Sequence, residues 1–153
     1  FGLINVEGEP MVIEYNCRFG DPETQAVLPL LKSDLLTVMQ KTAAGKLQPS
    51  DVQFSDDASC CVVLASDGYP EKYATGDEIS LPEEDGFLID GAGAKIKDGK
   101  LVTAGGRVLG VVAVRKDLKN AIGAAYRAAS GVQFANAFYR KDIGKRALAA
   151  LKK

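Results

Sequence analysis

The sequence contains no histidine among its 153 residues. This absence excludes Ser-His and Cys-His nucleophile pairs, imidazole metal sites and a histidine general base. Any catalysis must therefore use carboxylates, lysine, arginine, tyrosine, backbone dipoles or a hard metal ion. Chemistry that depends mainly on positioning and charge stabilisation, such as phosphoryl transfer, remains compatible with this composition.

Cysteine is also scarce, because the chain has only Cys17, Cys60 and Cys61. The number is odd and no C-x-x-C spacing occurs, so neither a zinc site nor a redox pair is indicated. Cys60 and Cys61 lie in an apolar run. We expect the cysteines to be buried free thiols in a reducing cytoplasm.

The chain has neither a strong excess of charge nor a long apolar run. Its 19 basic and 20 acidic side chains give a formal net charge of −1, which provides no field for nucleic acid or an anionic membrane. No segment approaches the roughly 20 apolar residues that a membrane span requires, and the N-terminus lacks the features of a signal peptide. We therefore expect a cytoplasmic protein without nucleic-acid or membrane partners.

The residues that are present predict a packed core, since 46% are hydrophobic and 25% are charged. The order of the expected strands and helices predicts an α+β fold. In the first part we expect a hairpin with strands at 2–6 and 11–17. A helix should follow, with Asp21 as its N-cap and Pro22 in its first turn, and should run to about residue 31. A second helix should be capped by Ser33 or Asp34 and end at Gly45.

A domain boundary is predicted at 48–51, which divides the chain into residues 1–48 and 49–153. The second part is interpreted as a small β-rich domain with one or two packing helices, expected at 117–130 and 143–153. The Asp98-Gly99 pair favours a tight hairpin turn. Strands are predicted at 59–65, 78–80, 87–90, 94–97, 100–103 and 107–115.

Three polar side chains alternate along and just beyond the strand predicted at 11–17. Alternation places Glu14, Asn16 and Arg18 on one face. A carboxylate beside an amide offers the hard oxygen ligands that Mg²⁺ prefers, and an arginine can hold a phosphate or carboxylate through two hydrogen bonds. The helix start after Gly20 favours anions. Spacing alone favours a simpler explanation, a solvated strand without any metal. The opposite face is expected to point into the core through Met11, Ile13, Tyr15 and Cys17.

Residues 14–25 form a long and distinctive run, Glu14-Tyr15-Asn16-Cys17-Arg18-Phe19-Gly20-Asp21-Pro22-Glu23-Thr24-Gln25. This run resembles the signature of glycinamide ribonucleotide synthetase, also called phosphoribosylamine–glycine ligase, a family of the ATP-grasp superfamily. The similarity continues at 65–70, 103–111 and 139–144. It covers essentially the whole chain but only the C-terminal portion of the family's length.

The resemblance implies that the chain is part of an ATP-dependent ligase of purine biosynthesis, which joins glycine to 5-phosphoribosylamine through glycyl phosphate. Glu14 and Asn16 would ligate Mg²⁺ (or Mn²⁺) bound to ATP. Arg18 would be the catalytic residue that holds the glycyl phosphate or neutralises developing charge. Gly20 and Asp21 would shape the substrate end of the site.

The same resemblance makes residues 1–48 the end of an ATP-grasp lobe and residues 49–153 the C-domain of the family. There, Gly105, Gly106 and Arg107 are the substrate-binding candidates, because glycines let backbone approach a ligand and arginine suits the phosphate of 5-phosphoribosylamine. A β-bulge or tight turn explains the two glycines equally well. Residues 139–142 are interpreted as a structural loop with solvated charges.

Two departures from the family limit this interpretation. Residues 91–94 read Gly-Ala-Gly-Ala where the family usually has His-Ala-Gly-Thr. The family's phosphate loop and adenine-contacting lysine belong upstream of the hairpin, so the isolated chain is expected to be inactive. The alternative function is a non-catalytic docking or carrier module of hybrid-motif type, with Lys95, Lys97 or Lys100 as the modified residue. The exposed edge of the hairpin favours self-association.

Overall fold

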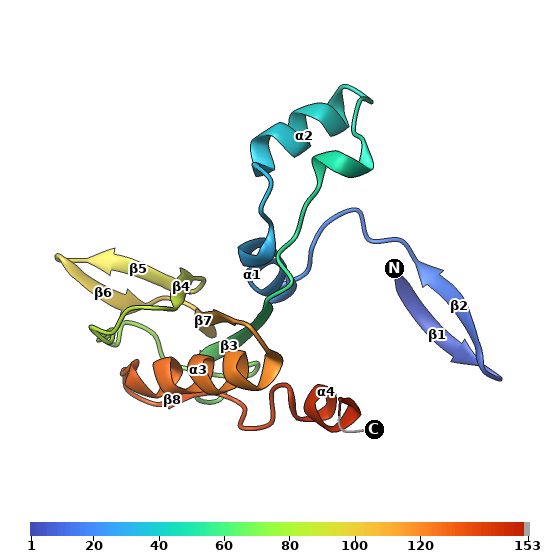
Figure 1. Cartoon of the computed structure of the whole chain (residues 1–153). Coiled ribbons are helices and arrows are strands. Elements are labelled where there is room, and N and C mark those ends of the chain that lie inside the picture. The colour runs from blue at the N-terminus through green and yellow to red at the C-terminus, as the bar shows by residue number, and fades with distance from the viewer. Residues whose placement is uncertain (152–153) are drawn as a thin grey trace.

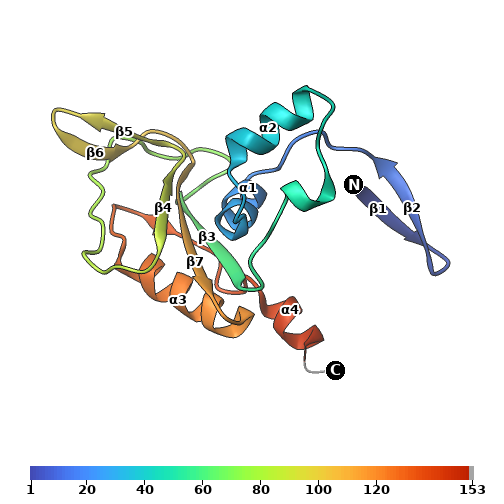
Figure 2. The same ribbon diagram turned by 45° about the horizontal axis from the view of Figure 1, so that its top comes forward.

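The computed structural model describes residues 1–151, which form a body and two projections. A β-sheet with a long helix against it forms the C-terminal body, from which the N-terminal hairpin and a helical arm extend in different directions (Figures 1 and 2). This arrangement confirms the predicted α+β class. The arm and the hairpin meet the body near a short helix, α1 (Glu23–Val27).

The body is built on a four-stranded antiparallel sheet in the order β4-β7-β3-β8. Its two long central strands are β3 (Ala58–Ser66) and β7 (Arg107–Arg115), and they coincide with the two predicted apolar runs. Both runs are largely buried because α3 (Leu118–Gly131) covers one face of the sheet while α1 contacts β3 and β7 from the other side (Figure 2). Strands covered on both faces lose the polar alternation of a half-exposed strand.

The main core lies between the sheet and α3. Val62, Leu64 and Val111 are fully buried on the strands, and they face an alanine-rich stripe of the helix. Small side chains at helical spacing let the helix approach the sheet closely. Asp117 caps this helix by accepting a hydrogen bond from the Asn120 N–H at 2.9 Å, at the start predicted for it. The buried stripe consists of Ala121, Ala124, Ala125, Ala128 and Ala129.

The shorter strands follow the predicted turn chemistry with some corrections. β4 (Leu88–Gly91) pairs with β7, and β5 (Ala94–Lys97) pairs with β6 (Lys100–Thr103). The turn residues Asp98 and Gly99 both have positive φ, as the expected hairpin turn requires.

The strand predicted at 78–80 is only a pair of isolated bridges, because Glu78 and Ser80 pair with different segments. Strand β8 (Ala137–Phe138) was not predicted, since two residues carry no periodic signal.

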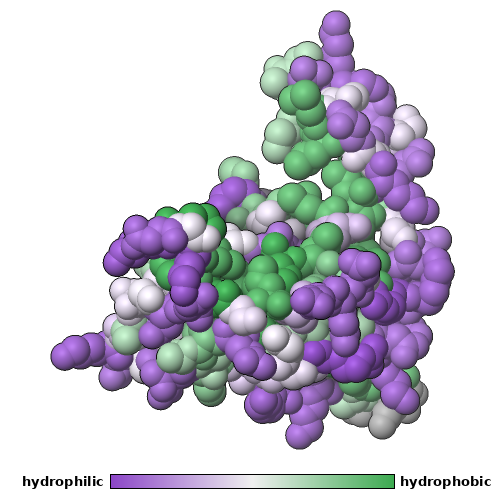
Figure 3. All heavy atoms as spheres, turned by 90° about the vertical axis from the view of Figure 1, so that its left-hand side faces the viewer, coloured by the Kyte–Doolittle hydropathy of each residue, from purple (hydrophilic) through white to green (hydrophobic). Residues whose placement is uncertain are grey.

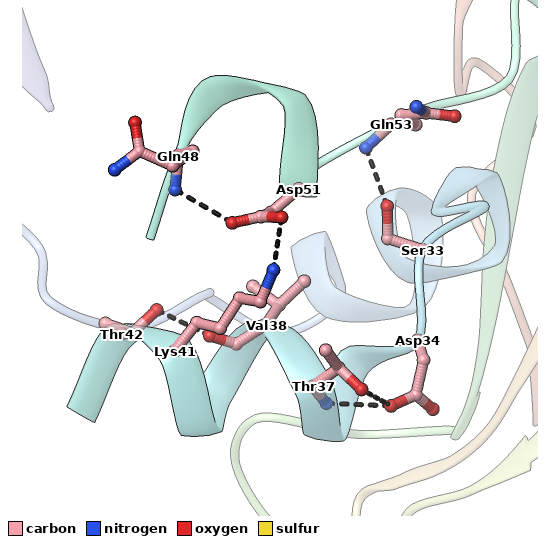
Figure 4. Close-up of polar contacts among 9 residues, drawn as sticks. All are labelled: Ser33, Asp34, Thr37, Val38, Lys41, Thr42, Gln48, Asp51 and Gln53. Atoms are coloured by element: carbon pink, nitrogen blue, oxygen red, sulfur yellow. Dashed lines mark hydrogen bonds and ion pairs between the residues drawn. The ribbon is translucent and has the colours of Figure 1, made fainter. Parts of the chain in front are cut away.

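The helical arm consists of α2 (Leu35–Ala43) and the 3₁₀ turn η2 (Pro49–Asp51). Asp34 caps α2 as predicted, by accepting hydrogen bonds from the N–H and the hydroxyl of Thr37. The Asp51 carboxylate joins the two elements, because it pairs with the Lys41 ammonium and also accepts from the Gln48 N–H (Figure 4). The predicted boundary at 48–51 thus falls on η2, inside a hydrogen-bonded unit.

The arm should respond to acid. The hydrogen bond from Lys41 holds the pKa of Asp51 below its ordinary value of 3.8. Stability from this contact is therefore present above pH 3.8 and is lost as the pH falls through the lower folded-state pKa. We expect the thermal midpoint of the chain to fall in that window, and to fall less in Asp51→Asn. Equal pH dependence of the two proteins would contradict this assignment.

The N-terminal hairpin pairs β1 (Gly2–Val6) with β2 (Glu9–Glu14). Strand β2 ends at Glu14, three residues before the predicted end, and all of its residues are exposed. The prediction that this face is buried is therefore wrong within residues 1–151, where no other segment covers the hairpin. The side chains expected in the core but found exposed are Met11, Ile13, Tyr15 and Cys17.

The other two cysteines lie in β3 and are buried free thiols, as predicted. Burial raises the pKa of Cys60, and burial with the nearby charges of Cys60, Asp90 and Asp21 raises the pKa of Cys61 to about 12. Neither thiol is a ready nucleophile.

The remaining helices are short. The 3₁₀ turn η1 (Leu28–Leu30) continues α1, and α4 (Lys145–Ala150) occupies most of the helix predicted at 143–153. Residues 152 and 153 of that prediction lie outside the described residues. Within 1–151, no helix is both long enough and apolar enough to cross a membrane.

Candidate functional site

The structure places the two predicted metal ligands side by side at the end of β2. The Asn16 Nδ2 donates to Glu14 Oε1 at 3.3 Å, and both side chains are exposed. A carboxylate and an amide oxygen suit a hard divalent cation. Among residues 1–151, no group of three or more acidic or cysteine side chains is arranged so that it could hold a metal ion by itself. An ion held by Glu14 and Asn16 would therefore need further ligands from water or phosphate oxygens.

Arg18 and Gly20 lie in the segment that connects the hairpin to α1. Arg18 is exposed, and its Nη1 donates to the Phe19 carbonyl at 3.4 Å. The Gly20 N–H donates to Glu23 Oε2 at 2.7 Å, and the Gly20 carbonyl accepts from the N–H and hydroxyl of Thr24. The Glu23 carboxylate thus already accepts from the Gly20 N–H, and anion binding at this helix start stays a prediction.

Asp21 is not the N-cap of α1, contrary to the prediction, since the helix begins at Glu23 with Pro22 before it and no side-chain cap. Its carboxylate has two other partners. Oδ1 accepts from Gln25 Nε2 at 2.9 Å, and Oδ2 pairs with Arg107 Nη2 at 3.2 Å. Arg107 Nη1 also donates to the Asp21 backbone carbonyl at 3.2 Å. Two predicted site residues, 86 positions apart, thus form one contact between the N-terminal segment and the sheet.

Gly105 and Gly106 have a structural explanation. A Cβ on Gly106 would lie 2.1 Å from the Tyr69 ring, and a Cβ on Gly93 would lie 2.6 Å from the Gly105 Cα. The β3–β7 register also shifts beside them, between Leu64 and Ala65, as a β-bulge does. Close packing therefore explains why glycine occupies these positions. Ligand binding by Gly105 and Gly106 stays a prediction.

Arg140 was assigned to a structural loop, yet it lies beside the predicted site. Arg107 and Arg140 line one cavity of about 280 Å³ together with Pro22, Cys61, Val63 and Ile143. The Arg140 Nε and Nη2 donate to the two Asp142 oxygens at 2.9 and 2.8 Å, which fixes the plane of the guanidinium. The Arg-Lys-Asp run was the only sequence signal, and spacing alone cannot show which cavity it faces.

A larger cavity of about 580 Å³ lies between the α1–η1 segment and β4. Asp21, Gln25 and Asp90 provide its polar wall, and Leu28, Pro29 and Leu88 provide apolar wall. On the face that lies on the left in Figure 1, apolar side chains gather in the hollow beneath the projecting arm (Figure 3). Among the described residues, no hydrogen bond or ion pair joins Glu14, Asn16 or Arg18 to the Asp21–Arg107 pair.

Comparison with known proteins agrees with this architecture. The family model described as phosphoribosylglycinamide synthetase, C domain, matches residues 59–146. The chicken (Gallus gallus) trifunctional purine biosynthetic protein adenosine-3 is 48% identical and aligns with 98% of this chain and 15% of its own length. The phosphoribosylamine–glycine ligase of Caldanaerobacter subterraneus subsp. tengcongensis is 46% identical, over 93% of this chain and 34% of its own length.

A solved structure shares the fold as well. The crystal structure of phosphoribosylamine–glycine ligase from Thermotoga maritima superposes with a TM-score of 0.83 at 39% identity, over 93% of this chain and 35% of that one. The chain spans about a third of the length of these two ligases.

Fold and site together define a two-part α+β protein, in which an exposed carboxylate–amide–arginine segment is tied to a helix-covered antiparallel sheet by Asp21 and Arg107. The chain belongs to the phosphoribosylglycinamide synthetase C-domain family, because the family model matches more than half of its residues. The resemblance inferred from residues 14–25 is thereby confirmed.

Proposed function

We propose that this chain acts as part of an ATP-dependent ligase of the cytoplasm that joins glycine to 5-phosphoribosylamine in purine biosynthesis. The observation that supports the proposal best is the alignment of nearly the whole chain, residues 14–25 included, with proteins named phosphoribosylamine–glycine ligase. In this proposal residues 1–48 are the end of an ATP-grasp lobe, and residues 49–153 are the domain that completes the site. Family membership favours this function over the carrier alternative, and Lys100 at that hairpin is paired with Glu78.

Glu14 and Asn16 would hold Mg²⁺ or Mn²⁺, which when bound offsets the charge of the ATP phosphates. Their contact at 3.3 Å supports a shared role, and their exposure leaves room for water and phosphate ligands. Arg18 would bind the glycyl phosphate, where a guanidinium can donate two parallel hydrogen bonds to phosphate oxygens. Arg107 would bind the phosphate of 5-phosphoribosylamine, with Gly20, Asp21, Gly105 and Gly106 shaping the surrounding backbone.

The direct test is a ligase assay with the full-length protein that contains this chain. ADP release should require both glycine and 5-phosphoribosylamine, and the product should be glycinamide ribonucleotide by mass spectrometry. ADP release that does not depend on one of the two substrates would overturn the proposal.

The exposed apolar side chains of the hairpin should make the isolated chain self-associate, which sedimentation can measure.

The isolated chain should give no turnover in the same assay. Proteins of this family that carry the ligase name are about three times as long, and the proposed adenine and phosphate contacts lie in their additional sequence. We expect ADP formation at the level of the no-enzyme background, measured with a coupled assay at the highest soluble concentration. Turnover close to that of the full-length protein would contradict this expectation. It would show that residues 1–153 contain every group that the reaction requires.

A further inference from the structure

The sheet of the C-terminal body holds the N-terminal segment through one polar contact. Arg107 Nη2 pairs with Asp21 Oδ2, and Arg107 Nη1 donates to the Asp21 carbonyl, both at 3.2 Å. Within the part of the chain that the structure describes, no other hydrogen bond or ion pair joins residues 1–29 to residues 55–151. Since one of the two contacts ends on a side chain, the orientation of the Arg107 guanidinium depends on where the Asp21 carboxylate lies.

This ion pair does not hold the carboxylate firmly by itself. The side chains of Arg107 and Asp21 are 41% and 44% exposed. At such exposure the charge interaction is offset by the side-chain freedom that both partners lose, so the pair alone is weak. The start of α1 gives no further help, because no side chain caps that helix. A third group has to restrict the Asp21 carboxylate if Arg107 is to keep one orientation.

Gln25 provides that restriction from α1. Its Nε2 donates to Asp21 Oδ1 at 2.9 Å, which leaves Oδ2 for Arg107. With a donor on each oxygen, the carboxylate is held in one rotamer. The Gln25 side chain is half-buried and lies against β7, where a Cβ added to Gly110 would be 3.9 Å from Gln25 Cγ. The contacts therefore run in one order, from Gln25 on α1 through Asp21 to Arg107 on β7.

The neighbouring charges determine which way the Gln25 amide points. In the opposite orientation Oε1 would face Asp21 Oδ1, and two acceptors would meet at 2.9 Å. Asp90 of β4 lines the same cavity as Asp21 and Gln25, so a second carboxylate is close by. The other titratable groups at this place are Arg107 and Cys61, and the Cys61 thiol stays uncharged because burial raises its pKa to about 12. The position therefore requires a hydrogen-bond donor.

We propose that Gln25 is a positioning residue, which fixes the Asp21 carboxylate and through it the Arg107 guanidinium. Asp21 accepts from two of the five N–H groups of Arg107, so three remain, and the contacts with Asp21 and Gln25 give them a fixed direction. That these donors meet a substrate rests on the proposed function. The order of the contacts does not, because it depends only on the three side chains. Gln25 itself touches no substrate in this arrangement.

The order of Arg107 can be followed without catalysis by NMR of this chain. The heteronuclear NOE of the Arg107 Nε–H, assigned by its loss in Arg107→Lys, reports how firmly the guanidinium is held. Gln25→Met keeps the length of the side chain and removes the donor, so this NOE should fall toward that of the exposed Arg127. Gln40→Met is the matched control, since Gln40 is an exposed glutamine on the arm helix α2, and it should leave the NOE unchanged.

Gln25→Glu tests the same contact through pH. When protonated, the introduced carboxyl donates to Asp21 as the amide does. When ionised, it is repelled by Asp21 and Asp90, so its pKa should lie above the usual value of about 4.3. The Arg107 NOE of this variant should match the wild type at acidic pH and fall as the pH rises through that pKa, whereas Gln40→Glu should show no such change. An Arg107 NOE that is the same in Gln25→Met as in Gln40→Met, or that does not respond to pH in Gln25→Glu, would overturn the inference.

Kinetics of the full-length protein separate this inference from the proposed function. Gln25→Met should raise KM for 5-phosphoribosylamine by about fivefold or more, the loss expected for one hydrogen bond, while KM for ATP stays unchanged. In an Asp21→Ala background the same substitution should change KM by less than about twofold, because the carboxylate that it positions is gone. An undiminished effect there, or no effect in the otherwise unaltered active protein, would count against the inference. A wild type without ligase activity, in which Gln25→Met still loosens Arg107, would count against the proposed function alone.

Discussion

Replacing Glu14 with alanine in the full-length protein should reduce kcat of the ligase reaction by on the order of 10²–10³-fold, the range seen when one charge-stabilising group is removed from an active site. Glu14 is the only carboxylate of the proposed metal pair, since its partner Asn16 contributes a neutral amide. Without the Glu14 carboxylate, the cation would bind more weakly and would be held less firmly beside the ATP phosphates. The apparent affinity for Mg²⁺, measured from the activity at different concentrations, should fall together with kcat.

Glu9→Ala is the matched control for this experiment. Glu9 is an exposed glutamate on the same strand, β2, and it lies at the opposite end from Glu14. The two variants remove the same charge from the same hairpin, so a general effect on hairpin stability would appear in both. If Glu9→Ala loses as much activity as Glu14→Ala, the loss comes from a less stable hairpin and not from a missing metal ligand.

Gly93→Ala should destabilise the C-terminal body by about 2–3 kcal/mol, the upper part of the usual cost of overpacking. The added Cβ would lie 2.5 Å from the Arg107 carbonyl oxygen and 2.6 Å from the Gly105 Cα. Both neighbours are backbone, so no side-chain rotation can relieve the clash. The Gly93 N–H also donates to the Arg107 carbonyl at 2.7 Å, and this hydrogen bond would have to lengthen.

Gly91→Ala is the control for that substitution, because it lies two residues earlier and nothing comes within 4 Å of an added Cβ. We expect its free energy of unfolding to stay within about 0.5 kcal/mol of the wild type. Chemical denaturation of the isolated chain measures both values. Similar stability of the two variants would show that the backbone around Gly93 can move, and would contradict the clash expected there.

Local rules predicted several elements correctly. The cap of α2 is Asp34, one of the two residues predicted for it, and α3 starts beside Asp117, where its helix was predicted to begin. Such starts are predictable because a capping side chain bonds a backbone N–H only three residues away. The turn at Asp98-Gly99 followed from the same kind of short-range constraint. The apolar runs that became β3 and β7 were long enough to be recognised as buried strands.

The same local rules failed at Asp21. Its sequence context, followed by proline and glutamate, is that of an N-cap, but its carboxylate binds Arg107 and Gln25 instead. Arg107 lies 86 positions along the chain, so no window of local sequence contains the competing partner. The carboxylate that accepts from a backbone N–H at this helix start, that of Gly20, belongs to Glu23.

The sequence by itself determined the chemistry available to this protein, because residue types do not depend on folding. It excluded histidine catalysis, identified Glu14, Asn16 and Arg18 as the candidate phosphate and metal residues, and established the family resemblance through residues 14–25. Only the tertiary structure decided which distant groups share a surface. Arg107 and Arg140 line one cavity, and Arg107 pairs with Asp21 from the N-terminal segment. These relations arise because antiparallel pairing and helix packing bring together segments whose separation along the chain carries no signal.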